Sequence, residues 1–284
     1  MSRAEAFRAL AVMSESPTVD HRRITGALGL SMPSRAEHTE LFSLQVYPYA
    51  SVYLGAEGML GGEARDRIAG FWRAIGLVPP AESDHLAALL GLHAALIDAD
   101  APPRARTALL WEHLLTWIPL FVDTVIRSAP GVYGSWATKL LDALLDEAST
   151  QPWDGPIPLH LRSAPPLPDP AHDPKGAVGA ILAPIRTGFV VTRADLARAA
   201  GEMGLGLRQG ERRFILGALL SQDAAGTFDW LAEHARAGAA RMKRLETSLN
   251  LITRFWVERA DAAAVLLQEC SAAAGEVVEV VARD

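Results

Sequence analysis

The chain contains one cysteine, Cys270, among its 284 residues. A single thiol cannot form an internal disulfide, and it excludes a metal site built from several thiolates. Basic residues are also few, because 27 lysines and arginines stand against 33 aspartates and glutamates and give a formal net charge of -6. This balance argues against a nucleic-acid-binding protein of the basic kind. An acidic surface could instead receive a positively charged peptide.

Catalytic and metal-binding motifs are absent as well. The sequence has no Gly-x-Ser-x-Gly nucleophile elbow, and its histidines form no His-x-x-x-His or His-Glu-x-x-His pair. The glycine-rich run at residues 55–62 lacks the lysine and the strand of a phosphate-binding loop. We therefore expect a protein that is not an enzyme and that holds no metal or cofactor.

The N-terminal region lacks a long apolar run. Charged residues at positions 3, 5 and 8 interrupt its first helical pattern, so it does not read as a targeting or membrane segment. Arg22 and Arg23 form a pair that resembles part of a twin-arginine export signal, but the segment after them is short and rich in glycine. We favour a short helix over residues 19–28 and expect the protein to act in the cytoplasm.

Helical periodicity is present through most of the chain. The segments with this spacing include 2–14, 19–28, 34–45 and 63–75. Residues 150–176 instead contain eight prolines and no periodic pattern, which is typical of a linker or an extended strap. The pattern predicts an all-α fold, with a helical domain over residues 1–149, the strap over 150–176 and a smaller helical extension over 177–284.

Residues 104–148 form the stretch around which the rest is organised. Its first half is hydrophobic on nearly every side, as expected of a helix with neighbours all around it. Pro119 removes a backbone donor and crowds the carbonyl four residues earlier, so we expect a kink near Leu115. His113 and Trp117 are four residues apart and share one face just before this kink.

Two further segments carry chemistry. YPYASVYLG, residues 47–55, holds three of the four tyrosines, which either contribute to a peptide-binding surface or fill the side of the core. Farther along, Ser83 is suited to cap a helix, and Asp84 stands where a carboxylate complements the first turn. A purely structural interpretation of Asp84 is therefore that it only stabilises a helix start.

A resemblance rests on these residues. Asp84-His85 at a helix start, followed by His113-x-x-x-Trp117-x-Pro119-x-Phe121, resembles the TorD/DmsD/NarJ family of molybdoenzyme maturation chaperones over about residues 35–148. The resemblance implies a TorD-like helical bundle that binds the twin-arginine signal peptide or the apo form of a molybdopterin oxidoreductase. Such a chaperone assists cofactor insertion before export.

The implied partner is the catalytic subunit of that oxidoreductase, bound by a monomer or a domain-swapped dimer. An arginine pair followed by an apolar helix requires carboxylates beside an apolar groove. The residues that we expect to bind the peptide are Tyr47, Tyr53, Glu82, Asp84, His85, Glu112, His113, Trp117, Pro119 and Phe121. We expect His85 and His113 to fix the Asp-His loop against the kinked helix by hydrogen bonds.

A competing interpretation comes from residues 192–222, which read as helix, glycine turn, helix. Thr192 is expected to cap the first helix and Gly204 to end it. Arg208, Arg212 and Arg213 at the second helix could contact DNA. The alternative function is thus a helix-turn-helix regulator with a helical sensor domain.

Overall fold

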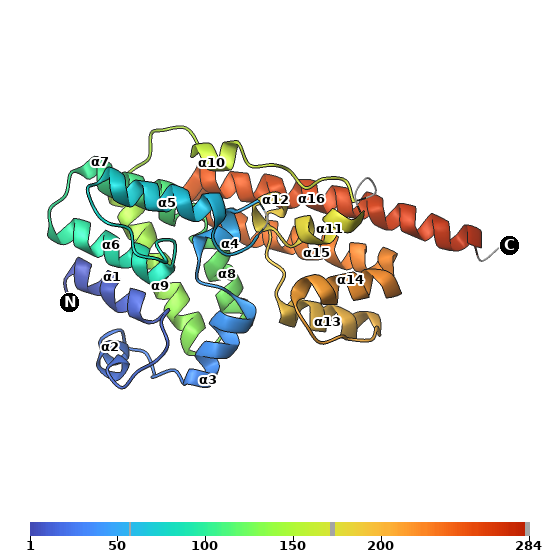
Figure 1. Ribbon diagram of the computed structural model, residues 1–284, viewed down its shortest axis with the longest axis horizontal. Coiled ribbons are helices and arrows are strands. Elements are labelled where there is room, and N and C mark those ends of the chain that lie inside the picture. The colour runs from blue at the N-terminus through green and yellow to red at the C-terminus, as the bar shows by residue number, and fades with distance from the viewer. Residues whose placement is uncertain (57, 171–173, 282–284) are drawn as a thin grey trace. The chain divides into compact units, whose positions relative to one another are not determined.

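The computed structural model describes residues 1–56, 58–170 and 174–281 (Figure 1). Over these residues the protein is helical without any strand, which confirms the all-α prediction. The chain forms two compact units, which we call the first unit (Met1–Gly55 and Met59–Arg162) and the second unit (Ala56–Gly58 and Ser163–Asp284).

The first unit contains most of the shorter helices. They are α1 (Arg3–Val12), α2 (His21–Ala27), α3 (Arg35–His38), η1 (Thr39–Gln45), α4 (Ala50–Leu54), α5 (Gly62–Ala74), α6 (Leu86–Asp98), α7 (Pro103–Ala108), η2 (Leu109–Leu114), α8 (Ile118–Ser128), α9 (Val132–Thr150) and α10 (Leu159–Arg162). Helix α1 packs against α6, and α8 packs against α9 (Figure 1). The elements η1 and η2 are π-helical.

Aromatic rings fill the centre of the first unit. Phe42, Trp117, Phe121, Tyr133 and Trp136 are all buried, and neighbouring ring centroids in this group lie 5.0 to 6.2 Å apart. The Trp136 indole also donates a hydrogen bond to the Leu10 carbonyl at 3.0 Å. Truncating one of these rings to alanine costs roughly 3–5 kcal/mol in typical cores. This group therefore holds α1, η1, α8 and α9 together.

The expected kink in the apolar stretch is present as a break between two helices. Helix η2 ends at Leu114, Trp117 has non-helical φ and ψ of -135° and -27°, and α8 begins at Ile118 with Pro119 in its first turn. The two segments are bent by 50°. Proline fits the first turn of a helix because N–H groups there have no acceptor within the helix, so the lack of an N–H costs no hydrogen bond. Pro119 thus starts a new helix after the break.

No single helix among the described residues has the length and apolar character of a membrane span. The bent pair Pro103–Leu114 and Ile118–Ser128 passes that test together, by length and composition alone. Its apolar side chains from Leu109 to Phe121 are buried in the fold, as expected of a core element.

The second unit has its own core. Its helices are α11 (Pro174–Ile181), α12 (Pro184–Thr187), α13 (Arg193–Met203), α14 (Arg212–Gln222), α15 (Ala224–Met242), η3 (Lys243–Leu245) and α16 (Glu246–Val281). Helices α15 and α16 pack along each other, and Leu196, Leu216, Leu231 and Leu267 are fully buried between the helices. Thr192 caps α13 and Gly204 ends it in the left-handed conformation, as predicted.

Candidate functional site

The segment before α4 is attached to the start of α6 by main-chain hydrogen bonds. The Ala50 N–H donates to the Asp84 carbonyl at 3.0 Å, and the Leu86 N–H donates to the Pro48 carbonyl at 2.8 Å. Between them, Tyr49 and His85 form an isolated antiparallel bridge. Two stretches that are more than thirty residues apart in sequence are thereby fixed side by side.

Asp84 lies inside this junction. Its side chain is buried, and its Oδ2 atom accepts a hydrogen bond from the Ser51 N–H in the first turn of α4 at 3.1 Å. The carboxylate therefore caps α4, whose own start offers no side-chain cap. In this conformation Asp84 does not face solvent. Its hydrogen bond holds residues 47–55, which we call the tyrosine segment, in position.

His85, and not Ser83, caps α6. Its Nδ1 atom accepts a hydrogen bond from the Ala87 N–H at 3.1 Å, whereas the Ser83 side chain is buried two residues earlier. The expected serine cap was wrong because the helix begins later than its polar residues suggest. Burial lowers the pKa of His85, against the opposing effect of nearby Glu82, Glu15 and Asp84. The imidazole is thus neutral at pH 7.

Four side chains form what we call the acidic face: Glu15, Tyr49, Glu82 and His85. The Tyr49 hydroxyl donates to Glu82 Oε2 at 3.0 Å, and the Tyr49 and His85 rings meet edge to face with centroids 4.7 Å apart. Burial, assisted by the Glu82 carboxylate, raises the pKa of Tyr49 to about 12. Glu15 and Glu82 are exposed, and both act electrostatically on His85. Two carboxylates therefore approach one partly buried aromatic pair.

Glu15 and Tyr49 were not among the residues predicted to bind a peptide. Tyr49 stands between two tyrosines that were, so the extended segment itself carried a signal for it. Glu15 follows α1, and its approach to His85 depends on packing between segments seventy residues apart. No local pattern in the sequence indicates this electrostatic interaction.

Tyr53, Trp117, Pro119 and Phe121 lie below the acidic face in the core. Tyr53 stacks on Trp117 at 5.3 Å, and its hydroxyl donates to the Tyr47 carbonyl at 3.1 Å. The Trp117 and Phe121 side chains have 0% exposure. Trp117 and Phe121 thus pack against Tyr53 from inside the core, and Pro119 is buried in the first turn of α8. Tyr47 is partly exposed.

Glu112 and His113 belong to a second polar group on η2, next to Arg67 of α5. The His113 ring lies 4.7 Å from that of Phe71, also on α5. Burial, followed by the charge of Arg67, lowers the pKa of His113 to about 4. Burial raises the pKa of Glu112, and Arg67 opposes this shift.

The predicted residues are thus divided between two places. The structure connects these places through Trp117, which stacks on Tyr53 and donates its indole N–H to the His113 carbonyl at 2.9 Å. The expected hydrogen bond of the His113 side chain is not seen: its Nδ1 atom is buried without a hydrogen-bond partner among the described residues. His85 uses its Nδ1 atom within α6, so neither ring fixes the loop as we expected.

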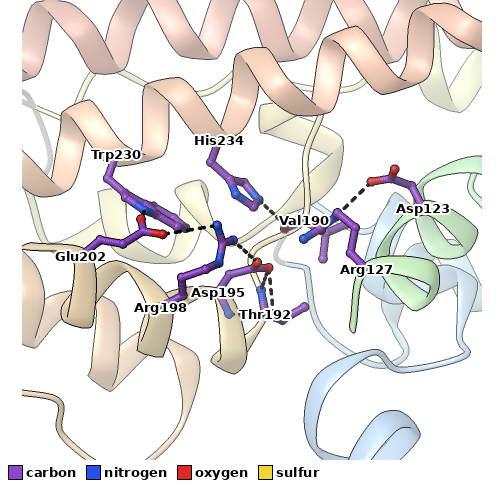
Figure 2. Close-up of polar contacts among 9 residues, drawn as sticks. All are labelled: Asp123, Arg127, Val190, Thr192, Asp195, Arg198, Glu202, Trp230 and His234. Carbon is purple, nitrogen blue, oxygen red and sulfur yellow. Dashed lines mark hydrogen bonds and ion pairs between the residues drawn. The ribbon is translucent and has the colours of Figure 1, made fainter. Parts of the chain in front are cut away.

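The second unit contains a polar network between α13 and α15 (Figure 2). Asp195 Oδ2 accepts hydrogen bonds from the Thr192 N–H and hydroxyl, and its Oδ1 accepts one from Arg198 at 2.7 Å. The Trp230 indole donates to Glu202 Oε2 at 2.7 Å, and Arg198 lies over the Trp230 ring. These contacts explain how α13 is held on α15 and suggest a structural role.

The helix-turn-helix residues are engaged in the same unit. The Arg212 guanidinium donates to the Val191 carbonyl at 2.9 Å, and Arg208 lies over the Phe214 ring at 5.8 Å. A surface hollow of about 780 Å³ beside α14 is lined by residues that include Leu207 and Phe214. Leu207, in the turn before α14, is 51% exposed.

No group of three or more metal-ligating side chains occurs in the part of the chain that the structure describes.

A family model described as nitrate reductase delta subunit matches residues 33–123, less than half of the chain. This family consists of redox enzyme maturation proteins, which are chaperones of molybdoenzymes. No curated protein matches the sequence. The matched segment contains all ten residues predicted to bind a peptide, and the comparisons do not support the DNA-binding alternative.

Proposed function

We propose that this protein is a maturation chaperone for the catalytic subunit of a molybdenum oxidoreductase, and that its acidic face binds the arginine pair of that subunit's twin-arginine signal peptide. The observation that carries the proposal is the position of the acidic face. Three of its four residues, Tyr49, Glu82 and His85, lie within the segment matched by the family of molybdoenzyme chaperones.

The chemistry of the acidic face suits an arginine pair. A carboxylate receives a guanidinium through two parallel hydrogen bonds, so Glu15 and Glu82 can each engage one arginine. The Tyr49 ring offers an aromatic surface on which a guanidinium can stack. Because burial lowers the pKa of His85, its neutral ring does not repel the incoming cations.

The apolar part of a signal peptide requires a different surface. Leu77 and Val78 lie in the loop just before Glu82 and are 42% and 89% exposed. We assign the apolar residues that follow the arginine pair to this loop. We propose that a leader bound in this way is withheld from export while the cofactor is inserted. We also propose that the chaperone acts in the cytoplasm, as a monomer or a domain-swapped dimer.

Buried Asp84 has an indirect role in this proposal. It fixes the start of α4 and hence the position of Tyr49, while Tyr53 and Trp117 support the same segment from the core. Asp84 is therefore a positioning residue for the acidic face. Glu112 and His113 are left without a direct part in binding the arginine pair.

Fluorescence anisotropy with a labelled twin-arginine leader tests the proposal. Glu82→Gln and Glu15→Gln should each weaken binding by about 1 kcal/mol, or roughly fivefold in Kd, as for a partly exposed charge pair. Glu233→Gln changes an exposed glutamate of the second unit in the same way and should bind the leader like the wild type. Equal binding by all four proteins would refute the assignment of the acidic face.

A further inference from the structure

A half-buried arginine in the first unit has a buried hydrogen-bonding edge that no described residue uses. Arg67 lies on α5, and its Nε and Nη2 atoms are buried without a hydrogen-bond partner among the described residues. These two atoms form one edge of the guanidinium, the fork that binds a carboxylate or a phosphate through parallel hydrogen bonds. Leaving a buried charged donor unpaired is costly, so a buried fork of this kind calls for an acceptor.

Two imidazoles stand beside this arginine. His113 on η2 and His160 on α10 interact electrostatically with Arg67 and with each other. The Nδ1 atom of His113 and the Nε2 atom of His160 are both buried without a hydrogen-bond partner among the described residues. The His113 side chain is only 5% exposed. The Phe71 ring, one helical turn after Arg67 on α5, lies 4.7 Å from that of His113, and His160 is close enough to act electrostatically on both polar groups. Three side chains from three helices thus carry unsatisfied buried nitrogen atoms and interact with one another.

The protonation states of the group favour an anion over a cation. Burial and the charge of Arg67 lower the pKa of His113 to about 4 and that of His160 to about 3, so both rings are neutral at pH 7. A neutral imidazole can turn one N–H toward an acceptor. Arg67 remains the charged group at the centre, with Glu112 and Glu63 as the acidic groups that act on it.

We propose that the guanidinium fork of Arg67, together with the ring nitrogens of His113 and His160, is a binding site for a small oxyanion. Phosphate and carboxylate groups share this chemistry. His160 lies on the short helix of the proline-rich strap, so the strap provides one wall of the site. Glu112 is the internal competitor, because its carboxylate acts on the same guanidinium. This site is separate from the acidic face and does not depend on signal-peptide binding.

Thermal unfolding of the full chain in sodium phosphate, against sodium chloride at equal ionic strength, tests the site. Phosphate should raise the Tm of the wild type in a saturable way, since a ligand that binds only the folded state stabilises it. Sodium acetate in the same series tests the carboxylate source. Arg67→Lys keeps the charge but loses the fork, and should weaken the response at least about tenfold. Arg73→Lys alters an exposed arginine of the same helix and should respond like the wild type.

Glu112→Gln removes the competing carboxylate and should strengthen the phosphate response. If Arg67→Lys does not fold, ring resonances of the wild-type histidines in an NMR titration with inorganic phosphate decide the matter, and those of His113 and His160 should shift together. An equal Tm response in the wild type and Arg67→Lys would overturn the proposal. The proposal would also be overturned if the ring resonances of His113 and His160 did not shift on addition of phosphate. That result would mean that water alone satisfies the ring nitrogens.

Discussion

Replacing Asp84 by alanine is the change whose effect the structure defines most closely. The carboxylate accepts a hydrogen bond from the Ser51 N–H in a place where both residues are buried, with exposures of 1% and 0%. Alanine leaves that N–H without an acceptor, and an orphaned buried donor costs about 1–3 kcal/mol. We expect the free energy of unfolding to fall by about 2 kcal/mol, within that range.

Thermal unfolding followed by circular dichroism measures this loss. A change of 1 kcal/mol moves the Tm of a protein of this size by about 2–4 °C, so Asp84→Ala should lower it by roughly 4–8 °C. Asp142→Ala removes an exposed carboxylate on α9 and should change the free energy of unfolding by less than about 0.5 kcal/mol. An Asp84→Ala variant with wild-type Tm and much weaker leader binding would refute the positioning role and favour direct contact with the peptide.

Two further predictions concern stability. Because the pKa of His113 is about 4 in the folded chain and ordinarily about 6.5, the unfolded chain binds the extra proton between these values, and stability falls as the pH falls through this window. Urea unfolding should show a loss of about 2 kcal/mol from His113 between pH 7 and pH 5. His113→Phe should make the profile shallower, with the remaining slope due to groups such as His160, whose pKa is also lowered, to about 3; an unchanged slope would contradict this. Gly188→Ala in the second unit should cost at least about 2 kcal/mol, because φ is +76° and the new Cβ would lie 2.4 Å from the Ala260 nitrogen; a wild-type Tm would show that this close approach is not required.

Local patterns predicted much of the helical structure. The capping residue Thr192 and the terminating Gly204 were correct because each signal acts within one turn of its own helix. The break before Pro119 was also predictable, since a proline excludes the hydrogen bond of a continuing helix. The π-helical turns over Thr39–Gln45 and Leu109–Leu114 have no such local signal, so they could not be predicted.

The candidate site was harder to predict because its contacts are long-range. Asp84 and Ser51 are 33 residues apart, and their hydrogen bond makes a buried cap of α4 from a carboxylate that was expected to bind a peptide or to stabilise the following helix. Neighbouring polar residues at a helix start also compete to cap it, and sequence alone could not select His85 over Ser83. The approach of Glu15 to the acidic face depends on where α1 is packed.

A double-mutant cycle on leader binding tests the central claim most directly. One arm replaces the two arginines of the leader by glutamines, the other replaces Glu82 by glutamine, and isothermal titration gives the four Kd values. If Glu82 binds the arginine pair, the two changes should be coupled by about 1 kcal/mol, so that the second change costs little after the first. Strictly additive losses, with no coupling, would contradict the claim that the acidic face receives the arginine pair.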